Sequence, residues 1–191
     1  WDTGRVYWHT ERADMGVHIR LPATALQASN RLAVTILCDL YRMGAKFTRI
    51  DLAADDLKGL LDMEVILAKV EQDDFVCRSR VVDQVRRLRG GAGNTLYFGS
   101  RASDTFFRIY DKAAEQAKKG VLFFGHWVRT EMELKHERAH EAAVYICENP
   151  ETWGETARGW FLRFLDFKEH EEDQTKSRWD TCGWWSEYLE N

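Results

Sequence analysis

The most informative part of the sequence is Asn94-Thr-Leu-Tyr-Phe-Gly-Ser-Arg-Ala-Ser-Asp-Thr-Phe-Phe-Arg-Ile-Tyr-Asp-Lys-Ala-Ala-Glu115, which predicts two short strands joined by a polar turn and then a helix. In the second strand, Arg108, Tyr110 and Lys112 follow one another at a spacing of two. Side chains alternate across a strand, so we expect these three on one face of a sheet. A phenol between two cations can attack a phosphodiester, which makes Tyr110 a candidate nucleophile. The alternative is a structural tyrosine with a packed ring and a hydrogen-bonded hydroxyl.

The composition of the chain indicates an ordinary globular protein, with 191 residues of which 45% are hydrophobic and 30% charged. A chain of this length buries roughly 70% of its unfolded surface, so it needs neither a disulfide nor a metal to fold. The four cysteines lie far apart without a C-x-x-C pair, which argues against a zinc site and fits a reducing cytosol. We find no signal peptide and no long apolar run, so we expect a cytoplasmic protein without a membrane partner.

A basic strip stands out in a chain whose net charge is −4. The segment from Arg78 to Arg101 holds one acid, Asp83, against several arginines. Such a strip on an acidic protein indicates a local anion-binding surface. The alternative is a solvated helix face balanced by nearby carboxylates, which charge runs commonly form. The candidate DNA-binding residues are Arg78, Arg80, Arg86, Arg87, Arg89 and Arg101.

The order of the expected elements repeats along the chain as strand, strand, helix, strand, helix. In the first half we expect them at residues 5–9, 15–21, 22–44, 46–53 and from 62 onward. In the second half we expect them at residues 95–99, 105–111, 113–119, 124–135 and 138–148. The sequence therefore predicts an α+β fold in which a duplicated module forms curved, mainly antiparallel sheets with helices on one side. This single domain over 1–191 would comprise halves 1–75 and 94–149, a basic connector 76–93 and a C-terminal helical segment 150–191.

The repeat brings two strands that carry carboxylates into matching positions. The last strand of the first half contains Arg49-x-Asp51, and its counterpart contains Arg129-x-Glu131-x-Glu133. We therefore expect Asp51 and Glu131 to approach each other near a pseudo-two-fold axis. Acids buried in a sheet need either a metal or an ionic partner. Oxygen ligands suit Mg²⁺ or Mn²⁺, but each acid could instead pair with the arginine two residues away.

Several segments of the chain resemble one known family when they are taken together. They are Thr95–Ser103, Phe107–Glu115, Trp127–Leu134, Arg49–Asp56 and Trp179–Leu189. These segments resemble the Rep_trans family, which comprises rolling-circle replication initiators of plasmids and filamentous phages and relaxases of some conjugative elements. The resemblance extends in order over nearly all of the chain.

The resemblance implies a topoisomerase-like enzyme that nicks one DNA strand at an origin and later reseals it. Tyr110 would attack the DNA, which leaves a 5′-phosphotyrosine and a free 3′ hydroxyl that primes rolling-circle replication or transfer. Arg108 and Lys112 would favour the phenolate of this tyrosine. The metal ligands for Mg²⁺ or Mn²⁺ would be Asp51, Glu131 and Glu133.

The same resemblance implies the partners of the protein, which are double-stranded and single-stranded origin DNA, a second copy in a homodimer, and the host's replicative helicase. Tyr97, on the neighbouring strand, is the rival nucleophile, and His18 is an outside candidate for metal binding. Two other functions stay open from the residues. One is a metal-dependent nuclease in which water attacks, and the other is an origin DNA-binding protein without catalysis.

Overall fold

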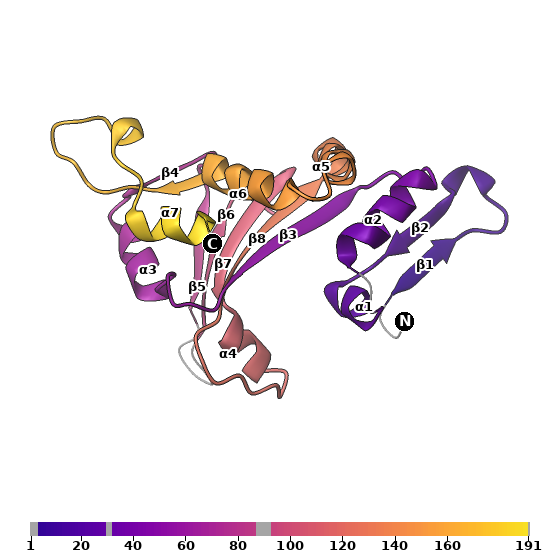
Figure 1. Cartoon of the computed structure of the whole chain (residues 1–191), viewed down its shortest axis with the longest axis horizontal. Helices are drawn as coiled ribbons and strands as arrows, with labels where there is room; N and C mark the ends of the chain where they lie inside the picture. Colours follow the sequence, from indigo (N-terminus) through magenta and orange to yellow (C-terminus); the bar gives the residue numbers. More distant parts are fainter. Residues whose placement is uncertain (1–3, 30–31, 87–92, 191) are drawn as a thin grey trace. The chain divides into compact units, whose positions relative to one another are not determined.

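The computed structural model describes residues 4–29, 32–86 and 93–190 (Figure 1). The chain divides into two compact units, Trp1–Lys46 with Ala143–Pro150 and Phe47–Ala142 with Glu151–Asn191. The expected halves, 1–75 and 94–149, both cross this division. The assignment of one nicking domain over residues 1–191 stays a prediction.

The first unit is built from a hairpin and a pair of helices. The two strands of the hairpin pair antiparallel and form a separate sheet. The hairpin is followed by two helices, so the strand, strand, helix order expected here is present. In chain order, these elements are β1 (Arg5–Trp8), β2 (Val17–Arg20), α1 (Ala23–Ala28) and α2 (Ala33–Arg42).

The prediction of a single helix between Pro22 and Gly44 is wrong, because two helices occupy that range. The first ends where the hydroxyl of Ser29 donates to the carbonyl oxygen of Leu26 at 2.6 Å, a local bond that competes with the helical ladder. The second ends as expected at Gly44, whose φ of 85° lies in the left-handed region that favours glycine.

The second unit contains a five-stranded sheet in which every neighbouring pair is antiparallel (Figure 1). The order across the sheet is β3-β8-β7-β6-β5. The strands are β3 (Arg49–Asp56), β5 (Val82–Arg86), β6 (Asn94–Phe98), β7 (Thr105–Asp111) and β8 (Val128–Lys135). The expected α+β class and the expected hairpin are confirmed, and the two strands that carry carboxylates, β3 and β8, are direct neighbours.

The edge strand β5 was not expected, because the sequence there predicted only a basic connector. Its two valines do not alternate with a period of two, so they give no strand signal. Val82 pairs with the buried Phe98, whereas Val85 pairs with Thr95 and is half exposed. The connector therefore contributes a strand to the sheet that carries Tyr110.

One face of the five-stranded sheet is apolar and covered by helices α6 (Trp153–Phe164) and α7 (Gly183–Glu190). The ring of Phe107 lies 5.2 Å from that of Phe161 and 5.8 Å from that of Phe164. The buried Thr130 and the hydroxyl of Tyr188 are 2.6 Å apart and hydrogen-bonded. Burial of one such phenylalanine contributes about 2 kcal/mol. The helix layer therefore fixes which face of the sheet is left for polar side chains.

The remaining helices continue the repeated order of elements. The helix after β3 begins where predicted, because the Asp62 carboxylate accepts a hydrogen bond from the Glu64 backbone N–H at 2.8 Å. The helices are α3 (Met63–Glu71), α4 (Lys112–Ala117) and α5 (His136–Glu148). In the described parts of the chain, none of the helices combines the length and the apolar character needed to cross a bilayer.

The C-terminal segment expected to be helical over 150–191 also contains a strand. Strand β9 (Leu165–Phe167) pairs antiparallel with β4 (Phe75–Cys77). Leu165 and Phe167 are fully buried while Asp166 between them is not, which is the alternation of a strand. The purely helical expectation for this segment is therefore wrong.

Candidate active site

The face of the five-stranded sheet opposite the helix layer is polar. Tyr110 of β7 lies beside Arg129 of β8, and Arg108 lies beside Glu131. On the next strand, Asp51 lies beside Glu133. The alternation of polar and apolar residues in β7 therefore places Arg108 and Tyr110 on one face, as the sequence predicted.

The Tyr110 hydroxyl donates a hydrogen bond to Oε2 of Glu131 at 3.1 Å. The other oxygen of this carboxylate, Oε1, pairs with the guanidinium of Arg108. Tyr110 and Glu131 are 9% and 8% exposed, so both groups are shielded from bulk water. The carboxylate thus links the phenol to a fixed cation.

Two cations flank the Tyr110 ring. The guanidinium carbon of Arg108 lies 5.5 Å from the ring centroid, and the Lys112 ammonium lies 5.6 Å from it. Lys112 is not part of the strand but the first residue of α4, because Asp111 caps that helix by accepting from the Ala114 N–H at 2.7 Å. The structure therefore brings the three residues together, although Lys112 follows the strand and is not part of it.

Arg108 favours the phenolate as expected, but its effect is outweighed in this arrangement. Burial and the charge of Glu131 raise the pKa of Tyr110 above its ordinary value, although Arg129 and Arg108 act in the opposite direction. The phenol therefore keeps its proton at neutral pH. The nearest group able to accept that proton is Glu131.

The three acids expected to bind a metal lie on β3 and β8 and are engaged in ion pairs. Asp51 accepts from Arg49 at 2.8 and 2.7 Å, and this arginine also pairs with Glu133 at 2.7 Å. The remaining oxygen of Glu133 pairs with Lys135 at 3.0 Å. Asp51 thus pairs with the arginine two residues away, as one alternative predicted, whereas Glu131 does not.

The oxygen atoms of Asp51, Glu131 and Glu133 are of the kind that bind divalent cations, and the three carboxylates project from one face of two adjacent strands. In the described residues, however, no group of three or more His, Cys, Asp or Glu side chains is gathered as a metal site would need. A metal would have to displace Arg49, whose side chain is 52% exposed and so has room to move away.

Residues 45–191 match the model of the Rep_trans family, which is described as a replication initiation factor. The chain belongs to this family. It is 31% identical over 158 residues to NicK of Bacillus subtilis (strain 168), which is named as a candidate DNA relaxase. That match covers 79% of this chain but 45% of the relative, so the chain spans less than half the length of the curated protein it matches.

The fold is similar to that of a rolling circle replication initiator protein from Geobacillus stearothermophilus. The TM-score is 0.82 at 26% identity, over 97% of this chain and 72% of that chain. The expected family membership is therefore confirmed. The similarity extends beyond the residues that the family model matches.

In this Rep_trans protein, one further acid supports the candidate site, although the sequence did not point to it. Asp55 of β3 accepts two hydrogen bonds from Arg129, each 2.6 Å long, and one from the indole N–H of Trp127 at 2.7 Å. Burial acts to raise the pKa of the Asp55 carboxyl, but these hydrogen bonds bring it below its ordinary value. The available signal was the position of Asp55 four residues after Asp51, which places both on the same face of β3. Asp55 holds Arg129 beside Tyr110.

The rival nucleophile Tyr97 also lies on the polar face of this Rep_trans protein, directly beside Arg108. Its ring stacks on that of Phe106 at a centroid distance of 5.5 Å. The guanidinium of Arg101 lies over both rings, 5.6 Å from each centroid. Tyr97 and Arg101 therefore form an aromatic and cationic patch one strand away from Tyr110.

The other basic candidates lie in several different places, where they are described at all. Arg78 is exposed but donates from Nε to the carbonyl oxygen of Arg163 at 3.1 Å, and so lies against α6 in the helix layer. Arg80 is exposed beyond β4 and Arg86 ends β5. Arg87 and Arg89 lie outside the described residues. His18 lies on β2 in the other unit, 5.8 Å from the ring of Tyr7.

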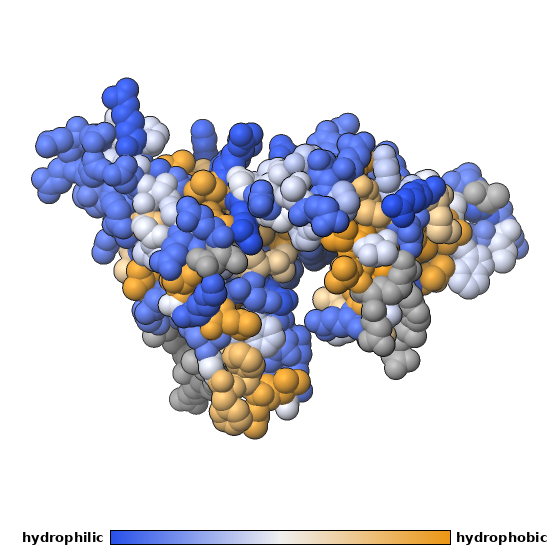
Figure 2. All heavy atoms as spheres, in the orientation of Figure 1, coloured by the Kyte–Doolittle hydropathy of each residue, from blue (hydrophilic) through white to orange (hydrophobic). Residues whose placement is uncertain are grey.

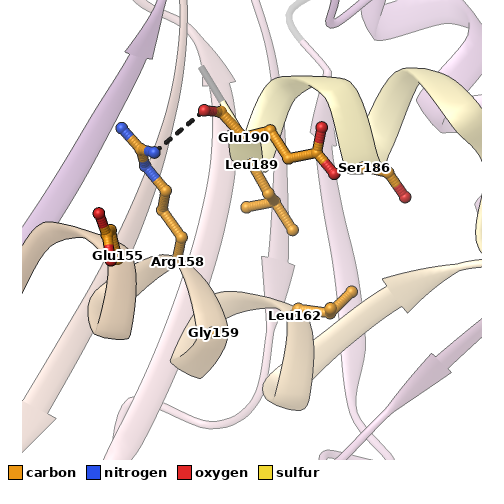
Figure 3. Close-up of a pocket in the computed structure, with 7 residues that line it drawn as sticks. All are labelled: Glu155, Arg158, Gly159, Leu162, Ser186, Leu189 and Glu190. Atoms are coloured by element: carbon orange, nitrogen blue, oxygen red, sulfur yellow. Dashed lines mark hydrogen bonds between the residues drawn. The ribbon is translucent and has the colours of Figure 1, made fainter.

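A pocket of about 430 Å³ between α6 and α7 is not the site. Figure 3 shows Arg158 reaching across it to the carbonyl oxygen of Glu190, at 3.1 Å. The pocket belongs to the helix layer, whereas Tyr110 and Glu131 lie on the polar face. The candidate active site of this Rep_trans protein is therefore a sheet surface rather than the pocket.

Proposed function

We propose that this protein initiates rolling-circle replication or transfer by nicking one DNA strand with Tyr110 and later resealing it. The observation that carries the proposal is the hydrogen bond from the Tyr110 hydroxyl to Glu131, 3.1 Å long, on the polar sheet face of a Rep_trans chain. The candidate-relaxase relative and the initiator with a similar fold support this reaction.

The nicking step needs one proton transfer and one exchange of phosphorus–oxygen bonds. The Tyr110 oxygen attacks the phosphorus and forms a phosphotyrosine with the 5′ phosphate of the downstream fragment, while the bond between this phosphorus and the 3′ oxygen of the upstream fragment breaks. The phenol proton passes to Oε2 of Glu131, and the departing 3′ oxygen leaves as a hydroxyl after it gains a proton from water. Attack by a 3′ hydroxyl on the phosphotyrosine reverses these changes and reseals the strand.

The neighbouring cations support this step. Arg108 holds the carboxylate of Glu131 in position through an ion pair. Arg129, fixed by Asp55, lies beside Tyr110 on the adjacent strand, where a positive charge stabilises the negative charge that builds up on the phosphate. Lys112 adds a second cation near the ring.

Asp51, Glu131 and Glu133 would hold Mg²⁺ or Mn²⁺ after Arg49 swings away. Such an ion supplies positive charge to the non-bridging phosphate oxygens. The proposed assignment of these ligands rests on the type of their donor atoms and on their positions on neighbouring strands.

The proposed path of the single strand crosses the polar face and includes the patch formed by Tyr97 and Arg101. Bases stack on aromatic rings and on guanidinium planes, with little dependence on sequence. The homodimer and the helicase partner stay predictions.

The decisive experiment incubates the protein and Mn²⁺ with a random-sequence pool of single-stranded oligonucleotides that carry a 3′ fluorescent label. The label must be at the 3′ end because the proposed intermediate joins the protein to the 5′ phosphate of the downstream fragment. We expect a labelled adduct that survives denaturation, is lost in Tyr110→Phe and persists in Tyr97→Phe.

Other outcomes identify the alternatives. An adduct lost only in Tyr97→Phe would make Tyr97 the nucleophile. Cleavage that occurs without any adduct and survives Tyr110→Phe would indicate a nuclease in which water attacks. DNA binding without cleavage in either Mg²⁺ or Mn²⁺ would indicate a binding protein.

A further inference from the structure

The loop between α4 and β8, residues 118–127, exposes a run of four large apolar side chains. Leu122 is 73% exposed and Phe124 is 92% exposed, with Val121 and Phe123 also exposed beside them. Figure 2 shows these hydrophobic side chains gathered at the end of the second unit where α4 lies. A contiguous apolar patch of this kind commonly marks an interaction surface.

The base of this α4–β8 loop is tied to the polar face that carries Tyr110. The Trp127 carbonyl oxygen accepts from the N–H groups of Lys112 and Ala113, at 2.8 and 3.2 Å. The ring of Phe123 lies 4.9 Å from that of Trp127. Trp127 in turn donates to Asp55, the acid that holds Arg129 beside Tyr110. The exposed tip is thus anchored to residues of the candidate active site.

The charged side chains of the loop itself, apart from its histidine, are both lysines. The sequence from Gln116 to Trp127 contains two lysines, Lys118 and Lys119, and no aspartate or glutamate. The side chain of Lys119 is 60% exposed although it pairs with Glu115. Apolar side chains flanked by lysines match a nucleic acid end, which offers a base-pair face surrounded by phosphates.

We propose that the α4–β8 loop is a wedge that binds the junction between duplex and single-stranded DNA. Phe124 and Leu122 cover the last base pair, the lysines contact the flanking phosphates, and the unpaired strand continues across the polar face toward Tyr110. This inference rests on the proposed function, because it assigns DNA to the same face. It adds a preference for forked DNA that nicking by itself does not require.

The test uses Tyr110→Phe protein as the parent, so that no probe is cut. The probes are a forked DNA, a blunt duplex of the same base pairs and the single-stranded arm alone, with 2-aminopurine at the last base pair of the fork. We expect the parent to bind the fork more tightly than the duplex and to lower the 2-aminopurine fluorescence, because side chains that cover the last base pair keep it stacked. Adding Leu122→Ser and Phe124→Ser should weaken fork binding about tenfold, the loss expected for one stacked base.

The controls separate stacking from general effects. The single variant Phe124→Trp, in which Leu122 is unchanged, should keep the preference for forked DNA, because an indole stacks as well as a phenyl ring. Val76→Ser removes a different exposed apolar side chain, on β4, and should change nothing. Affinity for the single-stranded arm should stay unchanged in all of these variants.

The inference is overturned if the double serine variant binds the fork as tightly as the parent. It is equally overturned if the serine changes abolish only binding to phosphatidylserine vesicles, or only self-association measured by sedimentation, since the loop would then serve a membrane or a second copy. A parent that binds the single-stranded arm but shows no fork preference overturns the wedge alone. If the wild-type protein formed no adduct with an excess of single-stranded DNA, that result would instead overturn the proposed function.

Discussion

Tyr110 and Glu131 are hydrogen-bonded across two neighbouring strands. At the scale of single residues, the proposed chemistry depends on which group holds the phenol proton. The carboxylate is held by Arg108 on one oxygen and by the phenol on the other. Two cations near a tyrosine suggested a phenolate, yet burial and the charge of Glu131 hold the proton on the phenol. In the proposed mechanism, the group that accepts the phenol proton is therefore the carboxylate of Glu131.

Replacing the carboxylate with an amide tests that role. Glu131→Gln keeps the size of the side chain but removes its ability to accept the phenol proton, and loss of such a group slows a reaction about 10²- to 10⁴-fold. We expect adduct formation to slow by at least the lower of these factors while the protein stays folded. Single-turnover measurements together with circular dichroism provide the check, and an adduct rate equal to that of wild type would rule out Glu131 as the proton acceptor.

The raised pKa of Tyr110 also predicts how stability depends on pH. In the unfolded chain tyrosine ionises near its ordinary pKa of about 10, whereas the folded protein keeps the proton to higher pH. The resulting stabilisation is complete below pH ~10 and is lost as the pH rises toward the folded-state pKa. Urea denaturation across that alkaline range should show a fall in the free energy of unfolding that is smaller in Tyr110→Phe. An identical fall in both proteins would contradict the buried environment of this phenol.

At the scale of elements, β3 and β8 are joined on the polar face by Arg49, which pairs with Asp51 on one strand and Glu133 on the other. We expect Arg49→Ala to tighten Mn²⁺ binding in the absence of DNA, since the carboxylates lose the cation that competes with the metal. Electron paramagnetic resonance of free Mn²⁺ measures this directly. Arg42→Ala, in α2, removes an exposed arginine elsewhere and serves as the control. Weaker binding in Arg49→Ala would show that the metal ligands have been assigned wrongly.

The sequence predicted the elements that carry a clear period and missed those that do not. Alternation in β7 placed Arg108 and Tyr110 on one face, and β3 and β8 are neighbours, but their register sets Asp51 opposite Glu133 rather than opposite Glu131. Strand β5 was missed because its valines lack a period of two. The partners of Glu131 could not be predicted, because they depend on the register between β7 and β8, which no local pattern specifies.

At the scale of the whole molecule, the proposed binding of DNA by a chain with a net charge of −4 requires local positive surfaces. Arg101, which follows β6 in the turn before β7, is an arginine of the basic strip whose guanidinium lies over the Tyr97 ring on the polar face. The remaining arginines of the strip are not gathered around this face in the described part of the chain. Local placement therefore matters more than total charge.

This distribution makes the salt dependence of single-strand binding a test of Arg101. Each phosphate contact on a single strand contributes a slope of about −0.7 to the logarithm of affinity against the logarithm of salt concentration. We expect Arg101→Ala to reduce the steepness by about that amount, and Arg12→Ala, at an exposed pair in the other unit, to leave it unchanged. Fluorescence anisotropy with a single-stranded oligonucleotide measures both slopes. Equal slopes in wild type and Arg101→Ala would remove Arg101 from the DNA path.

The most direct test of the nucleophile is mass spectrometry of the protein after reaction with single-stranded DNA and Mn²⁺, followed by digestion of the DNA and then of the protein. We expect a nucleotide mass on the peptide that contains Tyr110, with the fragment ions assigning it to that residue. A nucleotide on Tyr97 or on any other side chain would contradict the central claim that Tyr110 attacks the DNA.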